Sequence, residues 1–265
     1  MLNYMGAELY KLLRRKYLYI FTAVILAGEA LLVSGWVFTN AHGNDFDFFA
    51  GGINAVLFLS LGLYLLVIVS DLVFSDQYKH NTLKNEVSFG IPRTRIFLGK
   101  LFVEILLGIA LMIVFLGFYL GLCYLTLYKS PAEEVKALFQ EVGYCVLVAL
   151  PQWIGMLCVC HAAYFLLRSV MGAGIAFVAL LFVPQNASWI FGLMFNKPWL
   201  IQLQGLMPVK LIDTARTVYG VKLIDNVRTI LFDWGYVGRS WGMGAFWAVL
   251  SLTVGLIIFR KKEIS

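Results

Sequence analysis

Long apolar stretches alternate with short polar segments along almost the whole chain. Six of these stretches are long enough to cross a bilayer, which takes about 20 apolar residues in helical form. They cover residues 17–38, 53–74, 101–128, 142–167, 170–195 and 241–259. Within hydrocarbon, every backbone N–H and C=O group needs a hydrogen-bond partner, and a helix supplies these partners within its own segment. The pattern therefore predicts an all-α membrane protein, a single transmembrane domain over 1–265 with six transmembrane helices.

Composition supports this fold class and excludes others. Of the 265 residues, 61% are hydrophobic and 14% are charged, whereas soluble domains carry about 25% charged residues. A soluble fold of this length could not cover so much apolar surface, so an ordinary soluble enzyme is excluded. The net charge of +6 does not predict nucleic-acid binding, because basic residues beside transmembrane ends follow from the positive-inside rule.

The distribution of basic residues predicts the orientation. With the N-terminus in the cytoplasm, 13 of the 21 Lys and Arg residues fall on the inner side. Most of the others lie in the long 196–240 loop, and basic residues in long loops have less influence on orientation. We expect a multi-pass protein of the plasma membrane with both termini cytoplasmic. The 75–100 loop is then cytoplasmic and the 196–240 loop extracellular.

Residues 1–16 show the pattern of an interfacial helix. Four apolar residues recur on one helical face: Met5, Leu9, Leu12 and Leu13. The basic residues at its end would lie among anionic lipid head groups. These predicted membrane anchors are Lys11, Arg14, Arg15 and Lys16. The alternative is a disordered start to the chain.

The long 196–240 loop contains two patterned runs. Apolar residues recur at helical spacing over Pro208–Tyr219, where Pro208 can begin a helix and Gly220 can end it. A second run covers 223–231. The two runs predict short amphipathic helices that dip into the interface or cap the bundle.

Four ionisable residues lie within or beside the predicted spans: Glu29, Asp71, Glu104 and His161. Such residues are candidates for function because burying them is costly. Asp71 and Glu104 lie near predicted cytoplasmic ends, where water and basic neighbours are expected to reach them. Glu29 lies near the middle of the first span, and both a transport role and a structural hydrogen bond are open for it. We interpret His161 as a hydrogen-bonded core histidine rather than a metal ligand, and predict no metal site.

The phosphate-binding loop and the zinc-protease motif are missing from the sequence. It contains no G-x-x-x-x-G-K-[ST] and no H-E-x-x-H. We therefore expect the chain to bind no ATP in the P-loop manner and to be no enzyme by itself.

The 75–100 loop carries the most specific pattern. It contains Asn81-Thr82-Leu83-Lys84-Asn85, then Gly90-Ile91-Pro92-Arg93, then Leu98-Gly99-Lys100. With Glu8-Leu9-Tyr10-Lys11-Leu12 before the first span, this loop resembles the permease subunit of ABC-2-type ABC transporters, especially bacterial drug and antimicrobial-peptide exporters. Asn81 replaces the usual glycine, and Asp76-Gln77 stands near the place of the usual glutamate.

The resemblance implies a mechanism. The loop would form a coupling helix that docks on a separate P-loop ATPase subunit, which binds ATP and Mg. The coupling residues would be Asn81, Thr82, Leu83, Lys84, Val87, Phe89, Gly90, Ile91, Pro92 and Arg93, and Lys100 would be a further head-group anchor. The resemblance also implies an N-terminal elbow helix, re-entrant helices before the last span and a second permease copy or paralogue. It implies export of an amphipathic peptide, drug or lipid-like substrate.

Two other functions are compatible with six spans. An ion- or proton-coupled carrier or channel would act without an ATPase and would use Glu29, Asp71, Glu104 or His161 in a relay. An intramembrane enzyme is the least favoured, because no catalytic pair stands at usable spacing within the spans.

Overall fold

A computed structural model of the chain describes residues 2–43, 45–79, 86–167, 169–218, 220–224 and 227–261. Helices make up most of it. They are α1 (Leu2–Leu13), α2 (Lys16–Ala41), α3 (Phe48–Gly52), α4 (Ala55–Lys79), α6 (Arg93–Thr126), α7 (Ala132–Leu167), α8 (Val170–Met194), α9 (Pro198–Gln204), α10 (Pro208–Thr217) and α11 (Trp234–Lys261). Two short strands, β1 (Gly220–Ile224) and β2 (Val227–Leu231), precede α11.

Six helical segments of the described residues are long and apolar enough to cross a membrane. They are α2, α3 with α4, α6, α7, α8 and α11, and they match the six predicted spans. The starts of α6, α7 and α11 lie earlier than predicted, at Arg93, Ala132 and Trp234. Backbone hydrogen bonding continues into polar flanks, whereas a hydropathy pattern ends where the charged residues begin.

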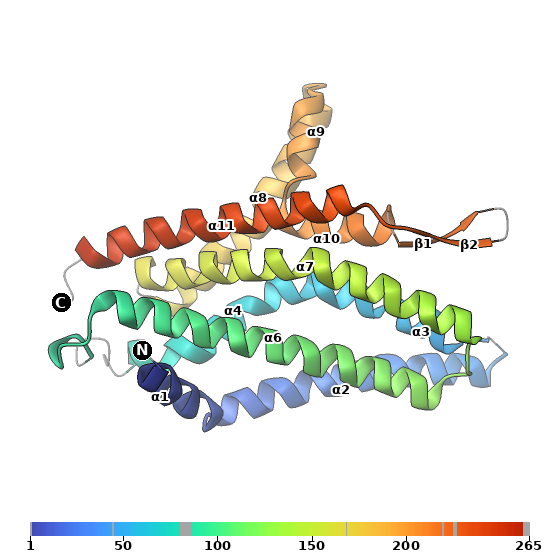
Figure 1. Cartoon of the computed structure of the whole chain (residues 1–265), viewed down its shortest axis with the longest axis horizontal. Coiled ribbons are helices and arrows are strands. Elements are labelled where there is room, and N and C mark those ends of the chain that lie inside the picture. Colours follow the sequence, from blue (N-terminus) through green and yellow to red (C-terminus); the bar gives the residue numbers. More distant parts are fainter. Residues whose placement is uncertain are drawn as a thin grey trace.

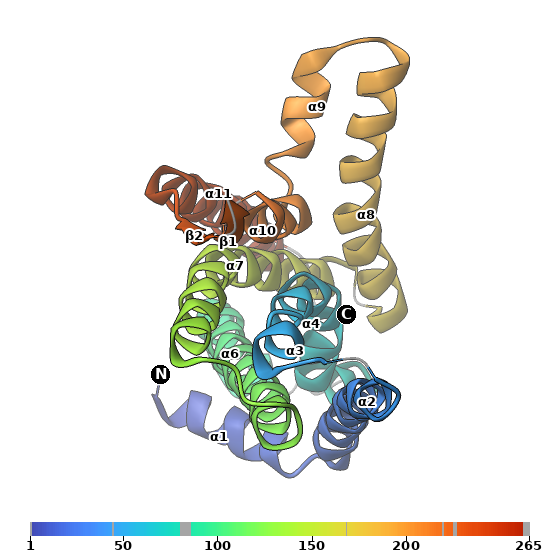
Figure 2. The same cartoon turned by 90° about the vertical axis from the view of Figure 1, so that its right-hand side faces the viewer.

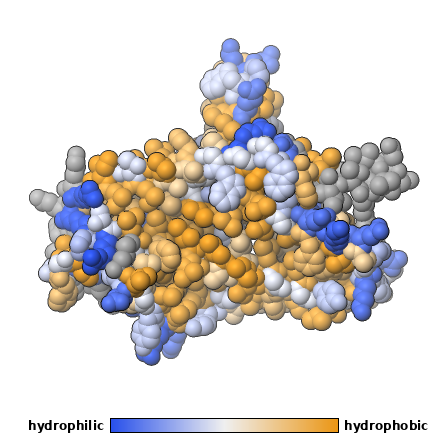
Figure 3. Space-filling view, viewed as in Figure 1, coloured by the Kyte–Doolittle hydropathy of each residue, from blue (hydrophilic) through white to orange (hydrophobic). Residues whose placement is uncertain are grey.

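Apart from α8, the long helices run along one axis of the molecule (Figure 1). Helix α7 packs on α11, α4 and α6, and 67% of its most apolar stretch is buried, compared with 11% for α2. Gln152 of α7 donates hydrogen bonds to the Ser240 carbonyl and hydroxyl of α11, at 2.6 and 2.9 Å. Figure 3 shows apolar side chains over the middle of this face and hydrophilic ones gathered at its two ends, as expected of a membrane-spanning bundle.

Helix α8 differs from the other spans because it leaves the bundle. Together with α9, which packs against it, it projects from the bundle as an arm (Figure 2). Only 17% of the most apolar stretch of α8 is buried. The predicted fifth span is therefore a helix, but one whose apolar surface this chain alone does not cover.

The 196–240 loop confirms one predicted helix and corrects the other. Helix α10 covers Pro208–Thr217 and buries Leu211 and Ile212. The second run forms an antiparallel hairpin instead, with Gly220 paired to Leu231 and Ile224 to Val227. The helical prediction was wrong because the same apolar residues also fit a strand period. The run is rich in β-branched residues, and Asp and Asn, which favour turns, separate its halves.

Candidate functional site

One end of the bundle brings together α1, the segment before α6, the first turns of α6 and the end of α11 (Figure 1, left). This is the end at which the resemblance places the coupling loop. Four predicted coupling residues, Asn81, Thr82, Leu83 and Lys84, lie outside the described residues. The following residues, from Glu86 to Arg93, are described.

A helical turn over 86–88 ends at Gly90. Gly90 has a φ of +80°, a conformation that glycine adopts without the cost other residues incur. Its N–H donates to the Val87 carbonyl at 3.0 Å, and the Ile91 N–H donates to the Glu86 carbonyl at 3.3 Å. These two bonds form the Schellman arrangement that ends many helices. The chain therefore ends this helical turn sharply at Gly90, just before α6.

The side chains of this turn divide into two sets. Val87 and Ile91 pack against the apolar core. Phe89 points away from it and is 84% exposed. An exposed phenyl ring on a firmly ended turn is a suitable contact for another protein, because aromatic side chains bury much area at low entropic cost.

A buried charged cluster joins α1 to α6 behind this turn. The Lys100 ammonium donates to Glu8 Oε2 at 2.6 Å and lies 3.7 Å from Glu86 Oε1. The Tyr4 hydroxyl donates to Glu86 Oε2 at 2.9 Å. Gly99 permits this approach, because a Cβ atom there would lie 2.6 Å from the Tyr4 ring. The cluster therefore fixes α1, the turn and α6 relative to one another.

The electrostatics of the cluster favour a charged Glu8. Burial by itself raises the pKa of this carboxyl, but Lys100 and then Lys11 oppose it, and the net pKa lies below the ordinary value. Lys11 contributes through a 2.6 Å contact with Glu8 Oε1. The pKa of Tyr4 is raised, first by burial and then by the charges of Glu8 and Glu86. Tyr4 therefore stays a hydrogen-bond donor at neutral pH.

The structure corrects the role expected for Lys100. This side chain is 2% exposed, so it cannot lie among lipid head groups as predicted. Glu8 provides the negative charge instead, because a buried ammonium needs a partner within its own fold. A polar residue on α1 was not recognised as this partner, since residues 8 and 100 are far apart in sequence.

The other predicted anchors lie around α1 in different environments. Arg15 donates to the Leu72 carbonyl of α4, and the Arg14 guanidinium lies 4.5 Å from the centre of the Tyr10 ring. Lys11, Arg14 and Lys16 are exposed. These three remain available for head groups, while Arg15 attaches α1 to the bundle.

Arg93 connects the start of α6 to the end of α11. Its guanidinium donates to the Phe259 and Arg260 carbonyls, both at 3.0 Å. The last carbonyls of a helix have no intrahelical partners, and a cation at that end also complements the helix dipole. The predicted coupling residue Arg93 therefore links the turn to the last membrane span.

A second polar cluster lies deeper in the bundle. His161 Nδ1 of α7 lies 2.9 Å from Glu104 Oε1 of α6, and the Ser70 hydroxyl of α4 donates to Glu104 Oε2 at 3.4 Å. Three phenyl rings surround the imidazole: Phe74, Phe97 and Phe165. Glu104 is fully buried, so the expected access of water to it was wrong. Helix packing, rather than distance from the membrane edge, decides its environment.

Glu29 belongs to neither cluster. It is 4% exposed and lines a pocket whose walls include neither Glu104 nor His161. The two predicted intramembrane residues, Glu29 and His161, therefore do not form one site. The signal for the Glu104–His161 pair was present in the sequence, because ionisable residues in separate apolar spans need partners.

Comparisons with known proteins bear on the whole of this arrangement. The model of the family described as "ABC-2 family transporter protein" matches residues 5–183, more than half of the chain. The matched region includes most of α1, the turn before α6 and, except for Tyr4, both polar clusters. Searches of curated proteins and of solved structures found no match to this chain.

Proposed function

Because the chain belongs to the ABC-2 family of transporter proteins, whose members include membrane permeases, we propose that it is the membrane-spanning subunit of an ATP-driven exporter. A separate P-loop ATPase subunit would bind ATP and Mg and hydrolyse the ATP. The observation that carries this proposal is the firmly held turn before α6, with Phe89 exposed on it.

The contacts around the turn suit a coupling element. Movement of a partner at Phe89 would be passed to α1 and α6 through Glu86, Lys100 and Glu8, and to α11 through Arg93. Rigid elements transmit such a displacement better than a loop that absorbs it. The proposed coupling therefore acts at once on α1, α6 and α11, at the end of the bundle where the turn lies.

The arm of α8 and α9 supports a second permease copy or paralogue as a further partner. Its exposed apolar side chains include Met171, Ile175, Phe182, Val183, Leu193 and Trp199. Exposed apolar surface of this extent marks an interface or contact with lipid. Two copies would also supply the second wall of a pathway.

The substrate class and setting follow from the resemblance. We propose export of an amphipathic peptide, drug or lipid-like molecule from a cell whose plasma membrane holds this chain with both termini in the cytoplasm. The exposed basic residues Lys11, Arg14 and Lys16 on and just after α1 support this orientation.

An ion- or proton-coupled carrier is the alternative function. The buried Glu104, His161 and Ser70 cluster favours it, because such groups form relays in transporters. His161 Nε2 has no hydrogen-bond partner among the described residues. Transport that persists without ATP and collapses with the proton gradient would favour the alternative.

Co-purification tests the proposed function. We expect a stoichiometric P-loop ATPase to accompany the tagged chain extracted from its native membrane in mild detergent. Phe89→Ala should lower its recovery about tenfold, since truncating an aromatic interface anchor costs more than 1.4 kcal/mol. Phe246→Ala, at a 53% exposed ring on α11, is the matched control and should retain the ATPase. A chain that purifies without an ATPase under all conditions contradicts the proposal.

A further inference from the structure

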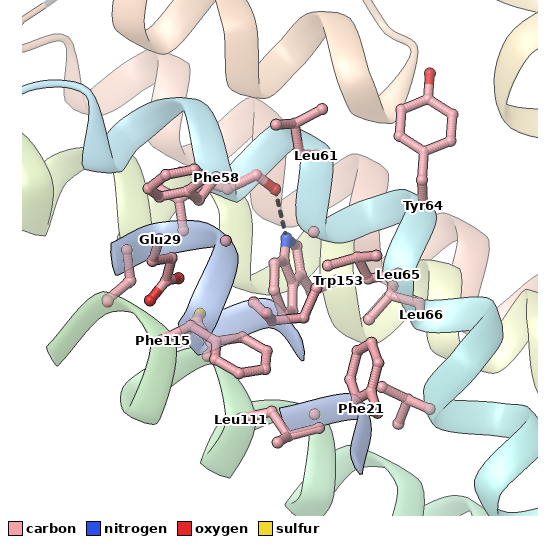
Figure 4. Close-up of a pocket in the computed structure, with 18 of the residues that line it drawn as sticks. Phe21, Glu29, Phe58, Leu61, Tyr64, Leu65, Leu66, Leu111, Phe115 and Trp153 are labelled. Carbon is pink, nitrogen blue, oxygen red and sulfur yellow. Dashed lines mark hydrogen bonds between the residues drawn. The ribbon is translucent and has the colours of Figure 1, made fainter. Parts of the chain in front are cut away.

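A pocket of about 460 Å³ lies between α2, α4 and α6, and Trp153 of α7 also lines it. This volume is within the range of about 300–1,000 Å³ found for small-molecule sites. Figure 4 shows Phe21, Phe58, Phe115 and Trp153 around the space. Apart from Glu29 and Tyr64, the lining side chains are apolar or aromatic.

The polar groups of the pocket are not equivalent. The Trp153 indole N–H donates to the Leu59 carbonyl at 2.9 Å, so it is satisfied within the protein. The Tyr64 hydroxyl points away from Glu29 (Figure 4). Glu29 Oε2 is buried and has no hydrogen-bond partner among the described residues. This carboxylate oxygen therefore has no described protein group that offsets its burial.

A carboxylate in these surroundings needs a positive partner. An unpaired buried charge costs several kcal/mol, and a cation placed beside it removes much of that cost. The aromatic walls add to the selection, because ring faces attract cations. A neutral ligand or a lipid acyl chain would fill the space but leave the Glu29 oxygen without a partner.

A small metal ion fits the pocket poorly. Hard cations take six or more oxygen ligands, and among the described lining residues Glu29 is the sole carboxylate. A cation that carries its own apolar groups needs no such ligand shell. The lining thus favours an organic cation over a bare or hydrated ion.

The rim of the pocket indicates the direction of entry. Val24, Leu32 and Leu61 line it and are 63%, 52% and 56% exposed. They belong to the apolar middle of α2 and α4, so the opening faces hydrocarbon or a neighbouring subunit rather than water. A ligand that enters there must first partition into the membrane.

We propose that this pocket binds a hydrophobic monovalent organic cation, an ammonium or phosphonium bearing apolar or aromatic groups, with the positive charge paired to Glu29. Such a cation is the substrate class for the exporter, a step that rests on the proposed function. Its binding to the purified chain requires neither ATP nor a partner.

The test uses the purified full chain in detergent with two probes of the same shape and opposite charge. We expect saturable binding of radiolabelled tetraphenylphosphonium and none of tetraphenylborate. Glu29→Gln should weaken phosphonium binding at least about tenfold, because it removes the charge and keeps the size. Glu133→Gln, at an exposed carboxylate in the first turn of α7, is the control and should bind as the wild type does.

A second pair of variants tests the cavity without changing charge. Gly28 lines the pocket, and a side chain there would meet no atom within 4 Å. Gly28→Leu should therefore fill the pocket and also weaken phosphonium binding about tenfold. Gly35, on the same helix and outside the lining, has equally open surroundings, so Gly35→Leu is its control. The elution volumes of all variants should match the wild type.

Three results would overturn the inference: no saturable phosphonium binding, equal binding of both probes, or unchanged binding in Glu29→Gln and Gly28→Leu. The partner ATPase should be recovered equally with wild type and Glu29→Gln. Loss of phosphonium binding with the ATPase still recovered refutes the pocket alone. Binding that depends on Glu29 without any ATPase refutes the proposed function alone.

Discussion

Glu104 and Glu29 are both acidic residues buried in apolar helices, but they differ in what surrounds them. Glu104 is fully buried between α6, α4 and α7, where His161 and Ser70 contact its two oxygens. Glu29 is nearly as buried on α2, yet one of its oxygens has no protein partner and it lines a pocket. Burial alone therefore does not distinguish a structural carboxylate from one that binds a ligand.

The difference shows how the bundle uses polar groups. A carboxylate that is paired across helices holds them together. Removal of one member of the pair leaves the other buried without its partner. A buried carboxylate without a partner makes the empty protein less stable. A cation that pairs with it removes this cost, so the complex is stabilised. Stability measurements on the two sites should therefore give opposite results.

The largest effect is expected at the Glu104–His161 pair. Glu104→Ala should lower the free energy of unfolding by about 3 kcal/mol, because His161 is left buried with neither nitrogen bonded. Unfolding of the purified protein by SDS titration measures this. The double variant Glu104→Leu, His161→Leu should recover most of the loss, since apolar side chains replace a buried pair at little cost. A Glu104→Ala protein as stable as the wild type would contradict a structural role for Glu104 and would favour its role in a proton relay.

A smaller effect is expected at Glu8, a third buried carboxylate that lies outside the membrane spans. Its pKa is lowered in the folded state from an ordinary value of 4.5, so it contributes stability that is complete above that value. This contribution is lost as pH falls through the lowered pKa. The melting temperature should be constant above about pH 5.5 and fall by a few degrees in more acidic buffer.

Lys100→Met provides the control for the acid transition. Without Lys100, burial raises the pKa of Glu8 with only Lys11 to oppose it. The fall in melting temperature should then begin at higher pH than in the wild type. An unchanged pH profile would show that the Glu8–Lys100 contact does not hold α1 on the bundle.

The smallest effect on stability is expected at Glu29. Glu29→Gln should change the free energy of unfolding by less than about 0.5 kcal/mol or raise it slightly, because it removes an unsatisfied ionisable group and breaks no bond to a described residue. The same SDS titration measures it. A loss as large as that of Glu104→Ala would show that Glu29 has a structural partner and would remove the contrast between the two sites.

The sequence predicted the helices well because their signal is local. Apolar runs of sufficient length identified all six candidate spans, and Pro208 marked the start of α10. Prediction failed where two local periods fit the same residues. The apolar residues of the 220–231 hairpin also match helical spacing. Its β-branched residues and the Asp225-Asn226 pair in the sequence favour strands.

The candidate site could be predicted only in part. The loop motif led to the turn that ends at Gly90 and to Arg93, since both depend on residues near one another in sequence. The partners of Lys100 and Glu104 were missed, because they are 92 and 57 residues away. Composition shows that a buried charge needs a partner, but it does not show which one.

By itself, the sequence determined a membrane protein with six apolar helices, the family to which it belongs and the turn before α6. Hydropathy, helix period and glycine conformation act over a few residues, so one chain read in order is sufficient. The tertiary structure alone decided that Lys100 pairs with Glu8, that Glu104 is satisfied by His161 and that Glu29 faces a pocket. These outcomes depend on how each helix is rotated about its axis, which packing between distant segments sets.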